Sequence, residues 1–525
     1  MKFNNITKWL PAAAIFVALG MSSCTNDLDV TPIDPNTQSE FLQNEVFTKI
    51  YSTLALTGSQ GPAGMGDVDG IDEGQSAFYR LVWNAQELPT DELKCNWGDP
   101  GIPEFNTNTW NATTSVVEGL YYRLYFDVTL CNFFLDKTSG KDDATSVAQR
   151  AEARFMRALN YYYLMDMFGN VAFPLQLSAT NPDPINRADL YTWLINELVG
   201  PEGCVNDMLE PGEATYGRAD KAAAWLLAAR LYLNAEVYTG TADWTNAALY
   251  AKKVMDSKYS LAPTYRNLFV ADNNENGAQV EVLLPIMQDG IKTQSYGGST
   301  FLIASTHKGD MGTYGITGAW AGNRATANMM QKFFPDDDAP HADEADMVAD
   351  AQDDRALFFG IDRELYIADK TTEFVNGYSS TKFNNVRSDG NASKDSNFAD
   401  TDIPFLRAAE AYLTYAEANA RLNGGVTDAL GTAAIDALRT RAHTTTQAVY
   451  DLNFILDEWS REFSFEGRRR IDLIRFGKFG GVNNYNWEWK GGLQTGTSFA
   501  SYLNVFPIPG KDLNNNNKLS QNPGY

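Results

Sequence analysis

Four segments carry apolar residues at the spacing of an amphipathic α-helix, and this pattern constrains the fold more than any other feature. The first runs from about Val147 to Met167 and is ended by Gly169, and the second lies between Asp220, a plausible N-cap, and Tyr238. Such spacing places the apolar side chains on one helical face, which predicts a mainly α fold. The four sets are Ala151, Phe155, Ala158, Leu159 and Tyr162; Ala222, Trp225, Leu226, Ala229 and Leu233; Leu406, Ala409, Leu413, Ala416 and Ala420, before Gly424; and Phe454, Ile455, Trp459 and Phe463, before Gly467.

The predicted helices mix alanine with large apolar residues, so neighbouring helices can approach closely. This mixture, in helix pairs joined by short turns, is typical of a degenerate tetratricopeptide repeat. The segment that most nearly resembles one repeat contains Trp244, Ala247, Ala248 and Ala251, followed by Tyr259 and Pro263. Long insertions separate the pairs, so we expect an α/α superhelical scaffold that carries loops, mainly at 40–60, 115–265 and 403–475.

The stretch from Asn267 to Asn397 is rich in Gly, Asn, Asp and Thr and has no clear periodicity. It predicts irregular loops with a few short strands, such as Val280 to Leu284. The loop-rich part is expected mainly at 61–112 and 267–400. Binding sites tend to be built on loops that a rigid scaffold supports, so this part is where a ligand site is expected.

The N-terminus resembles a bacterial lipoprotein signal. Lys2 and Lys8 precede a short apolar run from Trp9 to Gly20, and Met21 to Cys24 resembles a lipobox. A run this short cannot span about 30 Å of hydrocarbon, which favours a cleaved signal over a permanent anchor. We expect residues 1–23 to be removed and Cys24 to be acylated, tying the chain to a membrane. The alternative is an ordinary secretory signal with a chance cysteine.

The chain is strongly acidic. Removing residues 1–23 deletes Lys2 and Lys8 and no acid, which takes the formal charge from −24 to −26. Such a surface repels phosphate backbones and anionic headgroups, so nucleic acid is a poor candidate partner and lipid must supply the membrane attachment. Cys95, Cys131 and Cys204 remain, an odd number without paired spacing, so neither a disulfide framework nor a CxxC metal site is indicated.

Motifs for catalysis are mostly missing from the sequence. The histidines His307, His341 and His443 are scattered, and there is no HExxH, GxSxG, GxGxxG or Walker loop. Nucleophilic, zinc and nucleotide chemistry therefore lose support, and these motifs indicate no required cofactor. A glycosidase needs only two carboxylates at a suitable separation. Because the chain has 66 acidic residues, the sequence cannot exclude such a pair.

One partial motif concerns calcium. Asp272 to Gly277 matches the D-x-N-x-N-G opening of a calcium loop, which sets oxygen ligands at alternate positions around a glycine turn. The twelfth position is Leu283, where a bidentate Glu is required. A structural Ca²⁺ at Asp272, Asn274 and Asn276 is one reading, and a plain polar turn is the other.

Three aromatic residues stand in polar, glycine-containing loops: Trp97, Tyr296 and Trp320. Helical periodicity assigns none of them to a core. Flat rings with a polar edge are what the apolar face of a sugar stacks on, while neighbouring amides and charges bind its hydroxyls. The alternative is that each ring folds back to pin its own loop.

Several motifs together resemble the SusD/RagB family of surface nutrient-binding lipoproteins of Bacteroidetes. They are Leu28 to Pro35, Leu88 to Glu92, Ala151 to Gly169, Gly290 to Thr300, Phe463 to Gly477, Pro507 to Pro509 and Gln521 to Tyr525. The resemblance covers residues 24–525 as one domain. It implies a non-catalytic, tetratricopeptide-bearing helical protein that is lipid-anchored outside the outer membrane and forms a lid on a SusC-like TonB-dependent transporter.

In the starch-binding member of that family, an arc of aromatic rings follows the helical curve of an α-1,4-glucan. The resemblance places Trp97, Tyr296 and Trp320 in that arc, with Asp72 and Arg80 as polar contacts. The chain departs from the pattern at Cys95-Asn96-Trp97, where the family member has Trp-x-Trp, so one stacking surface is missing.

Two alternatives stay open. A family member that binds another glycan or a peptide predicts that the three rings do not converge, and a glycoside hydrolase predicts two carboxylates about 5 to 10 Å apart across a groove. The run Arg468-Arg469-Arg470 could suggest an anion site. Ion pairs with Glu462, Glu466 and Asp472 that lock the C-terminal segment are the favoured reading.

Overall fold

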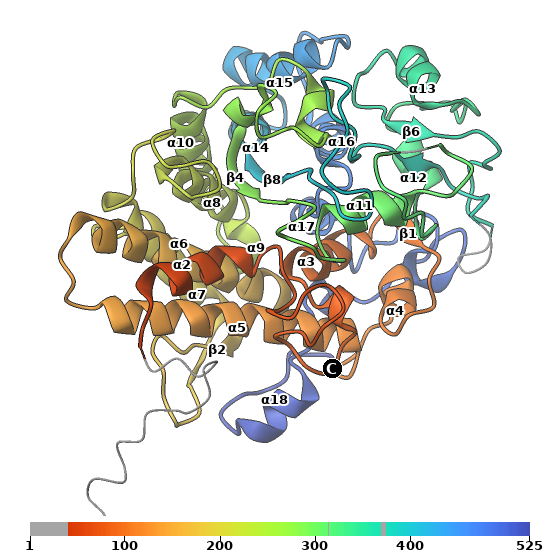
Figure 1. Ribbon diagram of the computed structural model, residues 1–525. Coiled ribbons are helices and arrows are strands. Elements are labelled where there is room, and N and C mark those ends of the chain that lie inside the picture. The colour runs from red at the N-terminus through yellow and green to blue at the C-terminus, as the bar shows by residue number, and fades with distance from the viewer. Residues whose placement is uncertain (1–39, 313, 369–373) are drawn as a thin grey trace, which may run out of the picture. The chain divides into compact units, whose positions relative to one another are not determined.

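Helices are the main regular structure, and long loops and short strands connect them (Figure 1). The computed structural model describes residues 40–312, 314–368 and 374–525. Residues Phe47–Tyr525 form one compact unit, to which every contact below belongs. The helices of eight or more residues are α2 (Gln43–Ser52), α3 (Phe78–Glu87), α5 (Ser115–Thr138), α6 (Ala144–Phe168), α7 (Arg187–Val199), α8 (Lys221–Leu233), α10 (Trp244–Met255), α11 (Ser299–Thr306), α13 (Glu344–Ala351), α14 (Ala408–Leu422), α15 (Ala429–Arg441) and α16 (Leu452–Phe463).

The shorter elements connect these helices. They are the helices α4 (Ile102–Thr107), α9 (Ala235–Thr239), α12 (Ala327–Met330), α17 (Arg469–Arg475) and α18 (Gly510–Asn515), and the 3₁₀ turns η1 (Glu73–Gln75), η2 (Cys204–Asn206), η3 (Tyr265–Phe269), η4 (Ala278–Val280), η5 (Lys490–Gly492) and η6 (Ser501–Asn504). The strands form antiparallel pairs: β1 (Leu93–Cys95) with β5 (Asn323–Ala325), β2 (Val171–Ala172) with β3 (Pro184–Ile185), β4 (Val282–Ile286) with β8 (Ile403–Arg407), and β6 (Phe358–Phe359) with β7 (Ser379–Ser380).

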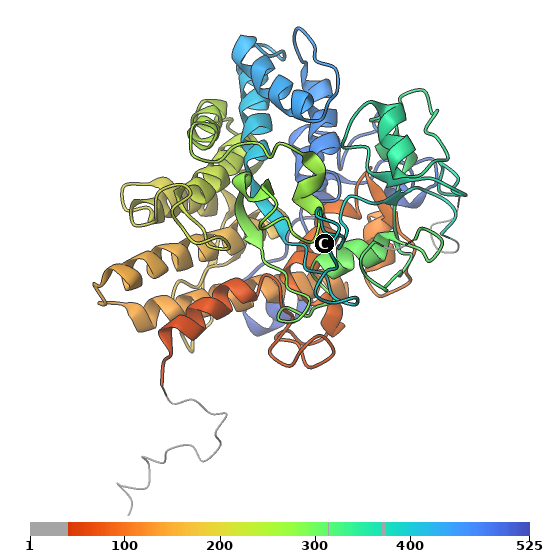
Figure 2. The ribbon, with the colours of Figure 1, turned by 45° about the horizontal axis from the view of Figure 1, so that its top comes forward.

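The longest helices, α5 and α6, form a packed pair, and Figures 1 and 2 both show them side by side. The side chain of Asp143 accepts a hydrogen bond from the Ser146 amide and caps α6, which ends where Gly169 adopts a positive φ of 72°. Only a residue tolerant of left-handed backbone ends a helix in this way at low cost. The predicted helix at Val147–Met167 is confirmed and extends slightly at both ends.

A second group of helices shares an alanine-rich core. The predicted cap of α8 is confirmed, since Asp220 accepts from the Ala222 amide. Helices α8, α10, α14, α15 and α16 contribute Ala228, Ala247, Ala416, Ile435 and Trp459 to one buried cluster. Small side chains on facing helices let the backbones approach, which is the packing that the repeat pattern predicted.

The third predicted helix begins later than its apolar pattern suggests. Leu406 belongs to strand β8, where it pairs with Leu284 of β4, and α14 starts only at Ala408. Leu406 is buried, and it would be buried in a helix as well as in a strand, so its apolar character does not distinguish the two. Pairing with the distant strand β4 decides between them. The predicted strand at Val280–Leu284 is likewise shifted: Val280 ends the turn η4, and β4 spans Val282–Ile286.

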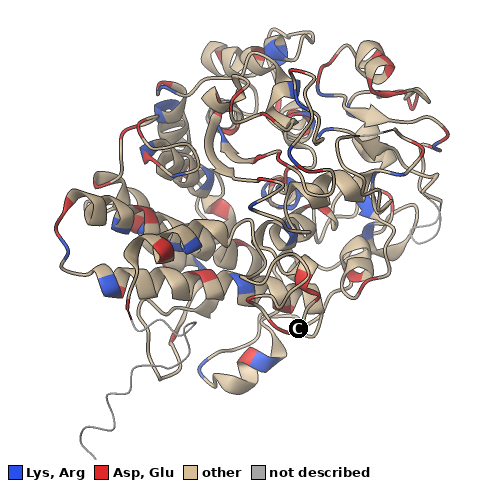
Figure 3. Ribbon diagram, in the orientation of Figure 1, with Lys and Arg blue, Asp and Glu red and all other residues tan. Residues whose placement is uncertain are grey.

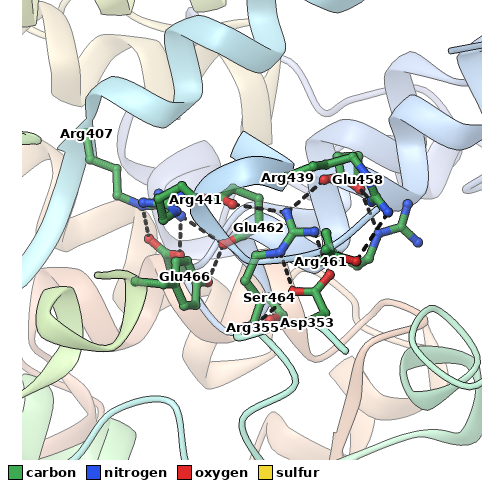
Figure 4. Close-up of polar contacts among 12 residues, drawn as sticks. Asp353, Arg355, Arg407, Arg439, Arg441, Glu458, Arg461, Glu462, Ser464 and Glu466 are labelled. Carbon is green, nitrogen blue, oxygen red and sulfur yellow. Dashed lines mark hydrogen bonds and ion pairs between the residues drawn. The ribbon is translucent and has the colours of Figure 1, made fainter. Parts of the chain in front are cut away.

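A buried network of ion pairs joins the C-terminal helices to the loop-rich part. We call it the charged seam and define it as Arg355, Arg407, Arg441, Glu458, Glu462 and Glu466, drawn with their neighbours in Figure 4. Arg355 Nη1 lies 2.8 Å from Glu458 Oε1, and Arg407 Nη1 lies 2.7 Å from Glu462 Oε1. Burial alone would raise the pKa of Glu462, but Arg441, Arg407 and Arg355 hold it well below its usual range.

The arginine run after α16 makes ion pairs, as predicted, but only one of its partners, Asp472, is a predicted one. Arg468 pairs with Asp472 at 2.9 Å and with Glu410 at 3.2 Å, while Arg469 forms a two-pronged pair with Asp91. The predicted partners Glu462 and Glu466 instead belong to the charged seam. The run therefore ties the C-terminal segment to the turn after α3 and to α14.

Candidate functional site

Strand pairing brings Trp97 and Trp320 together although 223 residues separate them. Trp97 lies two residues after β1 and Trp320 three residues before β5, and the register pairs Cys95 with Asn323. The Gly322 carbonyl accepts from the Asn96 amide at 2.9 Å, continuing the ladder. Trp97 Nε1 then donates to the Trp320 carbonyl at 3.1 Å, and the ring centroids are 6.3 Å apart, with planes inclined by 52°.

Gly322 is required for this contact. A Cβ at residue 322 would lie 2.2 to 2.6 Å from three atoms of the Trp97 indole, well inside van der Waals contact. The indole therefore rests directly on the backbone of the neighbouring strand. The missing side chain at residue 322 sets the depth at which Trp97 lies.

Tyr296 completes a set of three rings. It precedes α11, is 36% exposed, and lies 5.9 Å from Trp320 with an interplanar angle of 60°. Its other neighbour is Phe398, at a centroid distance of 5.3 Å. The sequence analysis did not identify Phe398, because its position in a polar loop is the only signal that it could belong to the site.

Arg80 connects the rings to the backbone. It lies on α3, is 7% exposed, and donates through Nη1 to the Gly74 and Tyr296 carbonyls at 3.3 and 3.1 Å. Its guanidinium carbon is 4.5 Å from the Phe301 ring centre and 5.7 Å from that of Trp97. Burial lowers the pKa of Arg80 to about 10, partly offset by Asp72 and Asp99 among others, so it stays charged at neutral pH.

Asp72 lies at the mouth of the same groove. It is exposed, and its Oδ1 accepts from the Gln75 amide at 3.2 Å, capping the turn η1. The groove has a volume of about 710 Å³. The structure thus brings together all five sequence-predicted contacts, Trp97, Tyr296, Trp320, Asp72 and Arg80, and adds Pro62, Ala63, Glu73, Gly74, Gln75 and Asp99. Asp99 and Glu73 were missed although each is close in sequence to a predicted residue.

Cys95, at the position of the missing aromatic ring, lies below the groove rather than on its wall. It is 1% exposed in β1, and burial raises the pKa of its thiol to about 12. The groove therefore has three rings at its surface, with Phe301 and Phe398 behind them.

The suggested calcium ligands lie in a hydrogen-bonded turn. Both carboxylate oxygens of Asp272 accept hydrogen bonds from Ser388, at 2.9 and 2.7 Å, and Asn276 Nδ2 donates to the Asn267 carbonyl. Among the described residues, no group of three His, Cys, Asp or Glu side chains is arranged to hold a metal. The calcium site at Asp272, Asn274 and Asn276 stays a prediction.

The lipoprotein signal and Cys24 lie outside the described residues. Within residues 40–312, 314–368 and 374–525, no helix combines the length and apolarity needed to cross a bilayer.

Comparison with known proteins identifies the family. A family model described as the SusD family matches residues 304–525. Over the whole of both chains, the sequence is 46% identical to the starch-binding protein SusD of Bacteroides thetaiotaomicron. The chain belongs to the SusD family. A SusD-like protein of Bacteroides ovatus is 26% identical, with 74% of this chain and 71% of that relative covered.

Solved structures agree on the SusD fold. Surface glycan-binding protein A from Bacteroides uniformis superposes with a TM-score of 0.68 at 19% identity, covering 91% of this chain and 98% of that one. A laminarin-binding SusD-like protein gives a TM-score of 0.66 at 19% identity, covering 93% and 100%. The predicted mainly α, SusD-like fold and the family resemblance are confirmed.

Proposed function

We propose that this protein binds starch-type α-glucan at the cell surface without cleaving it and passes it to a SusC-like TonB-dependent outer-membrane transporter. The observation that carries the proposal is the convergence of Trp97, Tyr296 and Trp320 in one groove with Asp72 and Arg80. The alternative of a family member with another cargo predicted that these rings would not converge. The full-length similarity to a starch-binding protein supports the same substrate class.

The ring geometry suits a curved neutral sugar chain. Trp320 is inclined by 52° to Trp97 and by 60° to Tyr296, so successive rings face different directions. A flat, ribbon-like glycan would meet one ring squarely and miss the next, whereas a helical α-1,4-glucan changes the direction of its apolar faces along the chain. Sugar hydroxyls can bond to the Asp72 carboxylate and to the guanidinium of Arg80.

The polar groups favour binding over hydrolysis. One Asp72 oxygen caps η1, and Glu73 bonds to the Thr57 hydroxyl, so both carboxylates have structural partners. Burial raises the pKa of Glu73, while the Thr57 hydroxyl opposes this. A glycoside hydrolase would need one carboxyl group to donate a proton to the leaving oxygen and a second carboxylate on the other side of the scissile bond.

Transfer and localisation rest on the family. Acylation at Cys24 would hold the chain at the outer membrane, facing the exterior, above the transporter. A Cys24→Ala protein is expected to bind glucan normally in solution and to be lost from the outer-membrane fraction. Fractionation followed by immunoblotting measures the second effect.

Affinity electrophoresis in gels with amylopectin, dextran or inulin tests the binding proposal. The wild-type chain should be retarded only by amylopectin. Trp320→Ala should weaken amylopectin binding about 30-fold or more, because losing a central aromatic contact costs about 2 kcal/mol. Tyr366→Ala is the matched control, since Tyr366 is 49% exposed and outside the groove. Unretarded wild-type protein in amylopectin contradicts the glucan assignment, and release of reducing ends would show an enzyme.

A further inference from the structure

A second aromatic groove lies on the outer face of α5. Tyr122, Tyr125 and Phe126 are spaced three and four residues apart, so they share one side of the helix. The buried side of α5 is formed by other residues, including Leu120, Tyr121, Leu124 and Val128. All three groove rings are half-buried. An outer helical face is normally polar, so a row of aromatic rings there needs an explanation other than the core.

The rings are held in place by their neighbours. The Tyr125 hydroxyl donates to the Ala172 carbonyl at 2.6 Å. Lys49 Nζ and the Arg123 guanidinium lie 5.8 and 5.5 Å from the centre of the Phe126 ring, and Asp67 forms ion pairs with both cations. A platform that is ordered before binding loses less entropy when a ligand stacks on it.

Polar groups surround these rings. Asp69 and Asn515 are exposed at the edge of the groove. Lys511 of α18 pairs with Glu118 of α5 at 3.0 Å, which holds α18 beside α5 (Figure 1). The groove volume is about 550 Å³. Aromatic faces with carboxylate, amide and ammonium groups around them match the composition of the Trp97–Trp320 groove.

The charge around the groove favours a neutral ligand. Asp67 is paired with Lys49 and Arg123 and Glu118 with Lys511, so the charges at the groove are nearly balanced, with Asp69 exposed at its edge. Lys and Arg are interspersed with Asp and Glu along the described ribbon (Figure 3), and the whole chain has a formal charge of −24. An anionic polymer would be repelled, whereas hydroxyls can donate to the carboxylates.

The two grooves flank the same loop. Asp72 lines the first groove and Gly70 the second, and two residues of chain span at most about 7 Å. A polysaccharide held in the first groove therefore passes close to the second. We propose that the Tyr122–Tyr125–Phe126 groove is a second glucan-binding surface, which holds another stretch of the same neutral polysaccharide.

This inference rests on the proposed function and predicts a dependence on chain length. A short oligosaccharide fills only the first groove, whereas a long glucan can occupy both and gains affinity through effective concentration. The double substitution Tyr122→Ala with Phe126→Ala should leave the Kd for maltohexaose within about twofold of wild type. It should weaken binding to soluble amylopectin about 10-fold or more, a modest effect beside the gain of about 100-fold or more that two linked sites can give.

The test compares four proteins by calorimetry with maltohexaose and by affinity electrophoresis with amylopectin. They are wild type, the double variant, Trp320→Ala and the control Tyr250→Ala, which removes a half-buried tyrosine from α10. Thermal melting confirms that each is folded. If the double variant does not fold, Tyr122→Ala alone replaces it, with an expected loss of about threefold.

The outcomes separate this inference from the proposed function. The second groove is overturned if the folded double variant binds amylopectin as tightly as wild type does, or if its affinities for amylopectin and maltohexaose fall equally. In either case Trp320→Ala still tests the first groove. Wild-type protein that binds neither glucan overturns the proposed function itself. Residual amylopectin binding by Trp320→Ala that disappears when Tyr122 and Phe126 are also replaced supports an independent second surface.

Discussion

The charged seam and the Trp97–Trp320 groove hold distant segments together by opposite means. In the seam, Arg355, Arg407 and Glu462 are buried and held mainly by ion pairs, so removing one carboxylate leaves buried arginines short of a partner. In the groove, partly exposed rings rest on backbone and on one another. The seam therefore governs stability, while the groove can present its surfaces to a ligand without endangering the fold.

The largest effect is expected in the seam. Glu462→Gln removes the charge shared by Arg355, Arg407 and Arg441, and should lower the free energy of unfolding by about 3–5 kcal/mol, as breaking a buried pair does. Urea denaturation measures this loss. Glu275→Gln is the control, because Glu275 pairs with Arg387 at the surface and its loss should cost at most about 1 kcal/mol. Equal losses in the two variants would remove the distinction between seam and surface.

A smaller effect, on affinity rather than stability, is expected in the groove. Gly322→Ala places a methyl group against the Trp97 indole and should weaken glucan binding about 10-fold, since overpacking costs about 1–3 kcal/mol. Gly98→Ala is the control, because Gly98 follows Trp97 in the facing loop and a Cβ there meets no atom within 4 Å. Calorimetry gives the affinities. A Gly322→Ala protein with wild-type affinity would show that the position of Trp97 is not critical.

Between the two regions lies a buried carboxyl pair that should respond to pH. Glu87, at the end of the helix that carries Arg80, accepts from the Gly467 and Arg468 amides and lies beside the buried carboxyl of Glu92. Burial and then Glu92 raise the pKa of Glu87 well above its usual value. A raised folded-state pKa stabilises the fold at low pH, and this contribution is lost as pH rises through that pKa, at about 1.4 kcal/mol per unit.

Glu87→Gln keeps the hydrogen bonds but removes the titration. It should reduce the loss of stability that follows a rise in pH above the ordinary glutamate pKa by about 1 kcal/mol or more. Glu92→Gln is the comparison, because Glu92 also lies 3.6 Å from Arg469 and its charge is useful there. Urea denaturation from pH 6 to 10 provides the measurement. If the free energy of unfolding of Glu87→Gln falls with rising pH as steeply as that of wild type, the pair does not share a proton.

The smallest effect concerns the loop at Asp272. If Asp272, Asn274 and Asn276 bind Ca²⁺, millimolar calcium should stabilise the fold by about 1 kcal/mol or less, following RT ln(1 + [Ca²⁺]/Kd). Asp272→Asn should abolish the calcium-dependent rise in Tm, whatever its basal Tm, and magnesium serves as the ion control. An unchanged Tm in wild-type protein would favour the plain polar turn.

The sequence predicted the helices well where local rules apply. The Asp220 cap and the stop at Gly169 each depend on a few neighbouring residues. Leu406 was assigned to the wrong element because its strand partner, Leu284, is 122 residues away, and no local pattern shows that pairing. For the Arg468–Arg470 run, the nearby partner Asp472 was predicted, whereas Asp91 was missed for the same reason, since it belongs to a distant turn.

For the site, the sequence by itself determined which side chains could bind a sugar: loop aromatics without a place in a helical core, with Asp72 and Arg80 added through the family resemblance. Only the tertiary structure decided that these residues share one groove. The pairing of β1 with β5, the lack of a side chain at Gly322 and the bonds of Arg80 to two carbonyls determine the distances between the rings. Composition and periodicity follow from neighbours along the chain, whereas convergence depends on contacts between segments some 200 residues apart.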